Sequence, residues 1–229
     1  MEGGNVPGFQ PPCQTDRMYN PAPFPEEHIE ILHAFIREHS LAIIVTCGEG
    51  GLEATHVPVV LHPDIGERGA MRCHVARANP QWKTIQASPT ILAIFGGPQH
   101  YISPSWYPSK KEHGKVVPTW NYAAVHVRGK ARTFEDRDEL IAHVTALTEE
   151  NERGLEMPWS VSDAPREYVE AMTKAIVGIE ISIGMIEGKW KASQNRPIAD
   201  RQGVVAGLTA LGSPESLEMA EMVREQGLK

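Results

Sequence analysis

The stretch Met71-Arg-Cys-His-Val-Ala-Arg-Ala-Asn-Pro-Gln-Trp82 joins a strand pattern directly to a helix start. Its alternating first half predicts a strand over residues 71–75. Asn79 is a good helix cap and Pro80 suits the first helical position, so a short helix is expected over residues 79–87. Similar apolar, β-branched patterns predict further strands, with helices between them. The predicted strands are 41–46, 53–61, 71–75, 91–95, 123–133 and 176–186, and the helices follow Pro25 or span 79–87, 138–150, 165–174 and 200–226 with a turn at Gly212.

This order is mainly β with inserted helices, an α+β pattern without strict βαβ alternation. It favours a closed or half-closed antiparallel barrel over a Rossmann sheet. The sequence contains neither GxGxxG nor GxxxxGK[ST], which excludes the commonest nucleotide-binding loops. The triplet Gly96-Gly97-Pro98 is expected to close the strand before it. We expect a flexible tail over residues 1–17 and a single domain over residues 18–229 with a C-terminal helical segment.

Composition narrows the function classes. The 229 residues include 22 Lys and Arg against 29 Asp and Glu, a formal charge of −7, which is unfavourable for DNA binding. The three cysteines are widely separated, and this excludes a zinc ribbon and a disulfide framework. Neither a signal peptide nor a membrane-length apolar run is apparent, so we expect a cytoplasmic location and no membrane contact.

The first candidate binding group lies at the strand-to-helix junction. Strand alternation puts His74 and Ala76 on one face, and Arg77 and Asn79 follow at the strand end. A helix N-terminus with an adjacent arginine suits a phosphate or carboxylate. A surface ion pair for Arg77 and a plain cap for Asn79 are the alternative. His74 could be a hydrogen-bonded core residue or an axial haem ligand.

The second candidate group is a long loop over residues 103–119 with its flanks. It carries large aromatic residues with polar tips, interleaved with Ser, Lys and Asn. Such side chains suit the wall of a planar ligand, although the two tryptophans could equally close the barrel end. The candidates are Tyr101, Ser103, Trp106, Trp120 and Asn121.

The third candidate group is cationic. Alternation sends Lys189 and Lys191 to the same strand face, and Gln194 and Arg196 follow. This predicts an anion-binding surface in an otherwise acidic protein. A solvated edge strand is the alternative, because edge lysines also block aggregation.

Together these motifs resemble the PaiB group of FMN-binding negative transcriptional regulators, within the FMN-binding split-barrel superfamily. The resemblance spans roughly residues 18–210. It is carried by Met18-Tyr-Asn-Pro21, Ala54-Thr-His-Val-Pro58, His74-Val-Ala-Arg-Ala-Asn-Pro-Gln-Trp82, Gly97-Pro98, Tyr101-Ile-Ser-Pro-Ser-Trp-Tyr107, Lys115-Val-Val-Pro-Thr-Trp-Asn-Tyr122 and Gly188-Lys-Trp-Lys-Ala-Ser-Gln-Asn195.

The resemblance implies a six-stranded antiparallel split β-barrel of the PNP-oxidase type and a homodimer with two cofactor clefts. FMN is the implied cofactor, its phosphate held near Arg77 and Asn79, with Trp120, Asn121 or residues 189–196 added by the second subunit. Thr55, His56 and Trp82 lie in the same motifs and join the expected site. The chain also resembles haem-dependent piperazate synthases, which share His-x-x-Arg-Ala-Asn-Pro, and there the histidine matching His74 ligates haem.

Three functions follow as hypotheses. The first is a dimeric FMN-dependent oxidoreductase-type protein acting on an unidentified small molecule. The second is a haem b enzyme of the piperazate-synthase type with His74 as ligand. The third is a transcriptional regulator without turnover. The sequence assigns no catalytic acid or base, because Tyr101, Tyr107 and His56 each have an equally good packing explanation.

Overall fold

The computed structural model describes residues 17–227, so the expected tail lies outside the described residues except for Arg17. Its centre is one antiparallel sheet in the order β3-β2-β6-β7-β8-β5-β4, with β1 paired to β8. The sheet contains eight strands, and the expectation of six is corrected. The strands are β1 Pro25–Glu26, β2 Leu41–Gly48, β3 Gly51–Pro58, β4 Val60–His62, β5 Ala70–Ala76, β6 Thr90–Ile102, β7 Thr119–Phe134 and β8 Ile176–Lys191.

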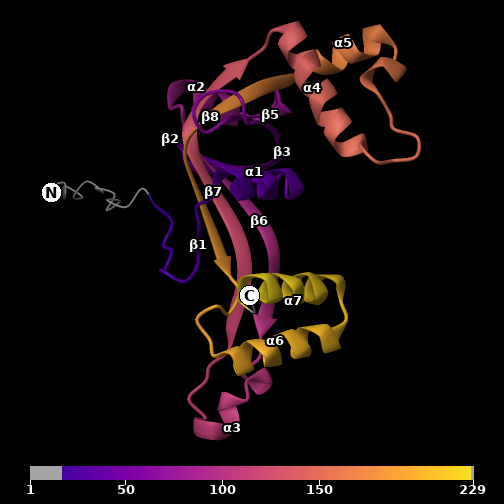
Figure 1. Cartoon of the computed structure of the whole chain (residues 1–229). Helices are drawn as coiled ribbons and strands as arrows, with labels where there is room; N and C mark the ends of the chain where they lie inside the picture. The colour runs from indigo at the N-terminus through magenta and orange to yellow at the C-terminus, as the bar shows by residue number, and fades with distance from the viewer. Residues whose placement is uncertain (1–16, 228–229) are drawn as a thin grey trace, which may run out of the picture.

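The helices occupy three places around the sheet (Figure 1). Helix α1 lies beside the barrel, and α2 follows β5. Helices α4 and α5 form an arm at one end of the long strands, while α3, α6 and α7 gather at the other end. The helices are α1 Ile29–Glu38, α2 Gln81–Ala87, α3 Ser109–His113, α4 Arg137–Glu152, α5 Arg166–Lys174, α6 Ile198–Leu211 and α7 Pro214–Gly227, with 3-10 turns η1 Pro104–Trp106 and η2 Val161–Asp163.

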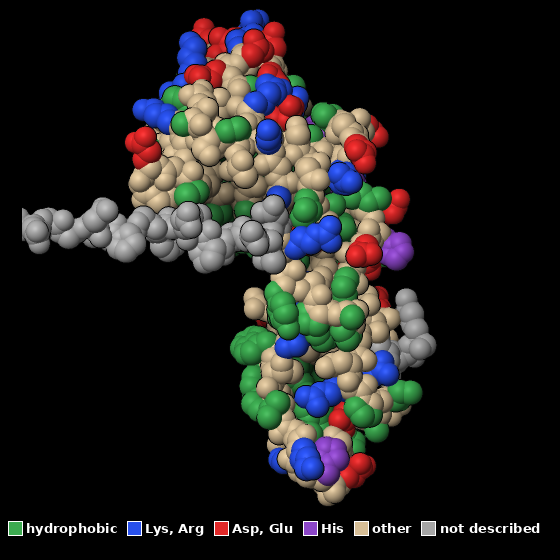
Figure 2. Space-filling model, turned by 90° about the vertical axis from the view of Figure 1, so that its left-hand side faces the viewer, with side chains coloured by type: hydrophobic (Ala, Val, Ile, Leu, Met, Phe, Trp, Pro, Cys, Tyr) green, Lys and Arg blue, Asp and Glu red, His purple; other side chains and the backbone are tan. Residues whose placement is uncertain are grey.

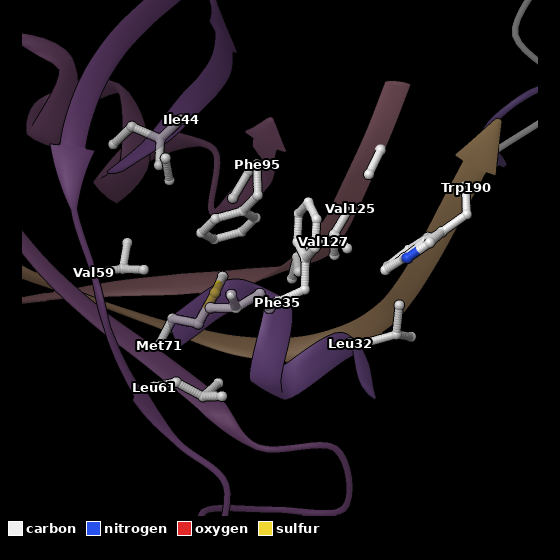
Figure 3. Close-up of a cluster of buried hydrophobic side chains, with 14 of the residues drawn as sticks. Leu32, Phe35, Ile44, Val59, Leu61, Met71, Phe95, Val125, Val127 and Trp190 are labelled. Atoms are coloured by element: carbon white, nitrogen blue, oxygen red, sulfur yellow. The ribbon is translucent and has the colours of Figure 1, made fainter. Parts of the chain in front are cut away.

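The barrel interior is filled by alternate side chains of the strands. Phe95, Val125 and Val127 have no or almost no exposed surface, and Leu32 and Phe35 of α1 close the opening against Trp190 (Figure 3). Helix α1 lies there because its apolar residues recur at helical spacing on one side. Burying this apolar surface is the main stabilising contribution to the fold.

The barrel is closed by side chains where backbone pairing stops. Asn79, just before α2, donates through Nδ2 to Thr55 Oγ1 of β3 over 3.1 Å. The buried Gln81 donates through Nε2 to Ile44 O and to Thr46 Oγ1. Since β3 is one edge of the sheet and β5 lies near the other edge, these bonds join the two sides. The gap between β3 and β5, which side chains bridge in place of backbone hydrogen bonds, makes this a split barrel.

Two predicted boundaries are wrong for identifiable reasons. Gly96-Gly97-Pro98 does not end β6, because a register shift between Gly96 and Gln99 accommodates Pro98, which has no N–H to donate. The predicted strand over 53–61 divides at Pro58 into β3 and β4 for the same chemical reason. The elongation of β6 and β7 carries the sheet well beyond the barrel.

The C-terminal lobe, formed by η1, α3, α6 and α7 on the ends of β6, β7 and β8, is built around Trp106. A Cβ on Gly203 would lie 1.9 Å from Trp106 O, and one on Gly207 would meet the Trp106 ring. The two glycines therefore let α6 approach η1 closely. Ser109 donates to the buried Asp200 through its backbone N–H and its hydroxyl, which ties α3 to α6.

Candidate functional site

The expected site residues form two separate groups along the chain. The barrel-end group comprises Thr55 and His56 on β3, His74 and Ala76 on β5, and Arg77, Asn79 and Trp82 at the start of α2. The lobe group comprises Tyr101, Ser103, Trp106, Trp120, Asn121, Lys189, Lys191, Gln194 and Arg196.

Within the barrel-end group, Asn79 has a structural role. Its Oδ1 accepts the Gln81 N–H over 2.9 Å, as a helix cap does, while its Nδ2 binds Thr55. Trp82 is held similarly, because its Nε1 donates to Arg77 O over 3.0 Å. His56 is exposed on β3, and Ala76 is exposed at the end of β5. These last two positions are open to a ligand at the barrel end.

Arg77 uses its guanidinium within the chain. Nε donates to Lys174 O, Nη2 donates to Ile176 O, and Nη1 pairs with Glu135 Oε2 at 2.5 Å. These contacts tie the end of β5 to the junction of α5 and β8. Because three of its donors are engaged in this way, Arg77 is a weaker candidate for the phosphate than the sequence suggests.

His74 faces α4 on the outer surface of the barrel. Its Nδ1 lies 3.0 Å from Nε2 of His143, a residue that is only 1% exposed. Burial lowers the pKa of His74, and burial, His74 and Arg72 together lower the pKa of His143 to about 3. Both imidazoles are therefore neutral at pH 7. Nδ1 of His143 is buried and has no hydrogen-bond partner in the described part of the chain.

The lobe group is strongly cationic. Lys189 is 7% exposed, donates to Tyr19 O over 2.9 Å, and lies over the rings of Tyr19 and Tyr122. Lys191 donates to Thr119 Oγ1 over 2.5 Å. Arg196 stacks on the Tyr107 ring with 5.0 Å to the ring centroid. Within residues 17–227, none of these three cations forms an ion pair with a carboxylate.

The three cations also influence one another. Burial lowers the pKa of Lys191, and the positive charges of Lys189 and Arg196 lower it further. Grouping like charges without a counter-ion is unfavourable, and a bound anion would relieve it. The arrangement is therefore suited to an anionic ligand.

Aromatic residues flank this cationic group. Tyr101 and Trp120 are cross-strand partners on β6 and β7, and their ring centroids lie 6.2 Å apart in an edge-to-face arrangement. Both rings are about half exposed, and Figure 2 shows hydrophobic side chains gathered on the surface of the C-terminal lobe. Trp106 and Ser103 are instead structural, since Trp106 packs on α6 and Ser103 caps η1 through the Ser105 N–H.

Within one chain the two groups do not converge, so the expected cleft, in which the second subunit adds residues 189–196, stays a prediction. Arg77 binds the carbonyl of Ile176, where β8 begins, and Lys189 lies thirteen residues later on the same strand. At about 3.3 Å per residue this is roughly 40 Å of strand. Figure 1 shows β8 running from the α5 end of the molecule to the α6 end.

Four contributing residues were absent from the expected site. Tyr19 and Tyr122 enclose Lys189, Tyr107 supports Arg196, and His143 pairs with His74. His143 follows the buried Leu140 by three residues, so helical spacing already indicates its inward direction. The contact between Lys189 and Tyr19 joins residues 170 positions apart in the sequence, so no local sequence pattern predicts it.

Among three surface cavities, one is lined by a residue of the expected site, Arg77, together with Glu135 and Lys174. One of about 430 Å³ lies between residues 17–27 and residues 184–188 of β8. Two more, about 420 and 620 Å³, lie along the α4–α5 arm. None of the three is lined by His74. The described residues contain no group of three metal-ligating side chains, and no described helix is long and apolar enough to cross a membrane.

The fold is shared with solved structures. The FAD and heme binding protein from Mycobacterium smegmatis superposes with a TM-score of 0.53 over 73% of each chain, at 13% sequence identity. At this identity the likeness concerns the fold alone.

The sequence comparisons identify the family of the chain. Residues 18–185 match the family model described as "Putative FMN-binding domain". An uncharacterized protein of Emericella nidulans is 36% identical, covering 92% of this chain and 98% of its own length. The Bacillus subtilis "Protease synthase and sporulation protein PAI 2" is 34% identical, covering 91% of this chain and 98% of its own length. The chain therefore belongs to the FMN-binding domain family, is a homologue of the Bacillus subtilis PAI 2 protein, PaiB, and has the PNP-oxidase-like split-barrel fold.

Proposed function

We propose that the protein is a homodimeric flavoprotein that binds FMN between subunits and uses it in oxidoreductase-type chemistry on a small molecule. The main support for this proposal is the group of three cations, Lys189, Lys191 and Arg196. None of them has a carboxylate partner among residues 17–227, although the chain has a formal charge of −7. FMN supplies both features that the lobe group suits, an anionic phosphate and a planar ring system.

The residues present fit FMN on three counts. The cations match the phosphate charge. The half-exposed rings of Tyr101 and Trp120 offer apolar surface for the isoalloxazine. The buried Oδ1 of Asn121, which has no partner within the described chain, shows that the polar network there is incomplete. When bound, the flavin supplies the hydride or electron transfer, and the protein supplies binding, orientation and electrostatics.

A second copy of the chain would complete the site. The barrel-end group and the lobe group lie at opposite ends of β8, so neither forms an enclosed cleft alone. A two-fold axis would place the barrel-end group of each subunit against the lobe group of its partner, which would generate two equivalent clefts. The exposed Tyr101 and Trp120 would then be covered in the assembly.

In this arrangement, the roles of the chain's own residues can be stated. Lys191 and Arg196 would hold the phosphate, while Tyr101 and Trp120 would exclude water from one face of the ring system. His56 and Ala76 of the partner, exposed at its barrel end, would approach the other face. The neutral His74 and His143 pair would support the partner's barrel end without touching the ligand.

Haem b is a less suitable cofactor. A haem ligand must be a neutral imidazole, and the lowered pKa of His74 meets that condition. The hydrogen bond of His74 Nδ1 to His143 leaves Nε2 as the atom that could ligate iron, but none of the three cavities described above reaches His74. The haem alternative therefore rests on His74 alone.

An absorption spectrum of the purified protein, and of apoprotein titrated with FMN or with haem, tests the proposal. We expect flavin bands that persist in His74→Ala and are lost when Lys191 and Arg196 are both replaced by alanine. A Soret band that disappears in His74→Ala would establish haem instead. Tight, salt-sensitive and sequence-selective DNA binding in a gel-shift measurement, without any bound cofactor, would favour a regulator without turnover.

A further inference from the structure

The turn that follows β8 is held in an unusual backbone conformation. Ser193 has φ 65°, and no other non-glycine residue in the described range 17–227 has a positive φ. This left-handed region brings Cβ close to the following carbonyl and is unfavourable for serine. Such a residue persists only where its surroundings determine its conformation, and Ser193 is 3% exposed.

Asn121, on the neighbouring strand β7, holds Ser193 in this conformation. It is 1% exposed and donates through Nδ2 to Ser193 Oγ over 2.9 Å. Its own backbone is fixed, because β7 pairs it with His100 of β6. Its Oδ1 finds no partner among residues 17–227, so within that range the amide binds Ser193 while its own acceptor stays unpaired.

Local hydrogen bonds close the turn on both sides of Ser193. The Arg196 N–H donates to Ser193 O over 2.9 Å. Gln194 Oε1 accepts the Ala192 N–H over 2.7 Å, and its Nε2 donates to Trp190 O. The chain reverses within these few residues, so Arg196 returns over the Tyr107 ring while Lys191 stays on the strand.

We propose that Asn121 and Ser193 are positioning residues that aim Lys191 and Arg196 at one phosphate group. The proposal rests on the proposed function, since it concerns the phosphate of the same FMN. Neither residue is proposed to contact the phosphate itself. Asn121 fixes the hydroxyl of Ser193, Ser193 fixes the left-handed turn, and the turn fixes the guanidinium of Arg196 relative to the Lys191 ammonium.

Two substitutions at one position separate the turn from the hydroxyl. Ser193→Gly removes the hydroxyl but favours a positive φ, because glycine has no Cβ. Ser193→Ala removes the same hydroxyl and keeps the unfavourable Cβ. A third variant, Asn121→Ala, removes the amide that holds the serine. Each purified variant is titrated with FMN and with riboflavin, which lacks only the phosphate, and dissociation constants are measured by flavin fluorescence.

We expect Ser193→Ala and Asn121→Ala to bind FMN about tenfold more weakly than the wild type, with riboflavin affinity changed less than about threefold. The preference for FMN over riboflavin should therefore fall about tenfold. Ser193→Gly should keep most of that preference, and the double variant Asn121→Ala with Ser193→Gly should bind FMN better than Asn121→Ala alone. A purely structural role would weaken both ligands equally.

The outcomes separate this inference from the function on which it rests. Wild-type protein that binds no FMN overturns the proposed function and this inference with it. Wild-type protein that binds FMN, together with a Ser193→Ala protein that retains the full preference over riboflavin, overturns this inference alone. Equal losses for FMN and riboflavin also overturn it. Thermal unfolding of each variant identifies any that fails to fold. If Ser193→Ala fails to fold, Ser193→Gly is compared with the wild type instead.

Discussion

Nδ1 of His74 lies 3.0 Å from Nε2 of His143, and this hydrogen bond joins β5 to α4 in a buried environment with His62 and Arg72 nearby. Burial lowers both pKa values, so the native pair stays neutral in a range where the unfolded chain takes up protons. The pair therefore links the stability of the fold to pH.

Stability should decrease in mild acid. The unfolded pKa is about 6.5 and the folded pKa of His143 is about 3, so the unfolded state binds more protons below pH 6.5. The contribution of His143 is complete above pH 6.5 and is lost as the pH falls. Between pH 6.5 and pH 5 we expect a loss of about 2 kcal/mol in the free energy of unfolding from this residue, measured by urea denaturation.

His143→Gln should make that pH dependence shallower, because an amide does not titrate. The exposed His113 offers a matched control, and His113→Gln should leave the slope unchanged. An identical slope in wild type and His143→Gln would show that His143 is not held neutral.

Arg77→Ala should destabilise the fold more than it weakens FMN binding. Its guanidinium binds two carbonyls and Glu135, so its removal loosens the α5–β8 junction by about 1–2 kcal/mol. Thermal unfolding and FMN titration of the same protein measure the two effects. Arg224→Ala, which breaks an exposed pair with Glu221 and an exposed hydrogen bond to Thr209, should change stability by less than about 0.5 kcal/mol. A large loss of FMN affinity in a stable Arg77→Ala protein would restore Arg77 as the phosphate ligand.

Lys191→Ala and Arg196→Ala should each raise the Kd for FMN about tenfold, and the FMN Kd of the wild type should rise with salt. Lys111→Ala is the control, because Lys111 is exposed on α3 and has no part in the cationic group. If all three variants bind FMN alike, the anion site lies elsewhere.

Gly203→Ala should destabilise the C-terminal lobe by about 3 kcal/mol, since the added Cβ would lie 1.9 Å from Trp106 O. Gly50→Ala has open space and should be nearly neutral. Denaturant unfolding of the two variants gives the comparison, and equal stabilities would mean that α6 does not approach η1 as closely as described.

The sequence predicted the fold class because each predicted strand carries its own local pattern, as the run around His74 and the Ile-rich run after Ile176 illustrate. It could not predict the length of β6, since a bulge at Pro98 depends on pairing with β7. Arg77 was placed in the site from its local chemistry and from the family resemblance, and the acceptors that engage Arg77 come from residues up to 99 positions away.

The candidate residues follow from local patterns and from the family resemblance, and the sharing of the site between two subunits stays a prediction. Strand alternation correctly put Lys189 and Lys191 on one face, while Asn121 was named from the aromatic loop and from the family resemblance. Their distance from the barrel end follows from the length of β8 beyond the barrel, which no local pattern encodes. The left-handed Ser193 has no local signal either, because serine rarely adopts that conformation.

The central claim is that one cleft takes its barrel end from one subunit and its cationic lobe from the other. Two chains with different affinity tags are co-expressed, one carrying Arg196→Glu and the other His56→Glu, and the doubly tagged heterodimer is isolated. Neither variant alone should bind FMN, whereas the heterodimer has one intact cleft and should bind about one FMN per dimer, against about two for the wild type. A heterodimer that binds no more FMN than the two parent variants, or a wild-type chain that is monomeric with FMN bound, would contradict the account.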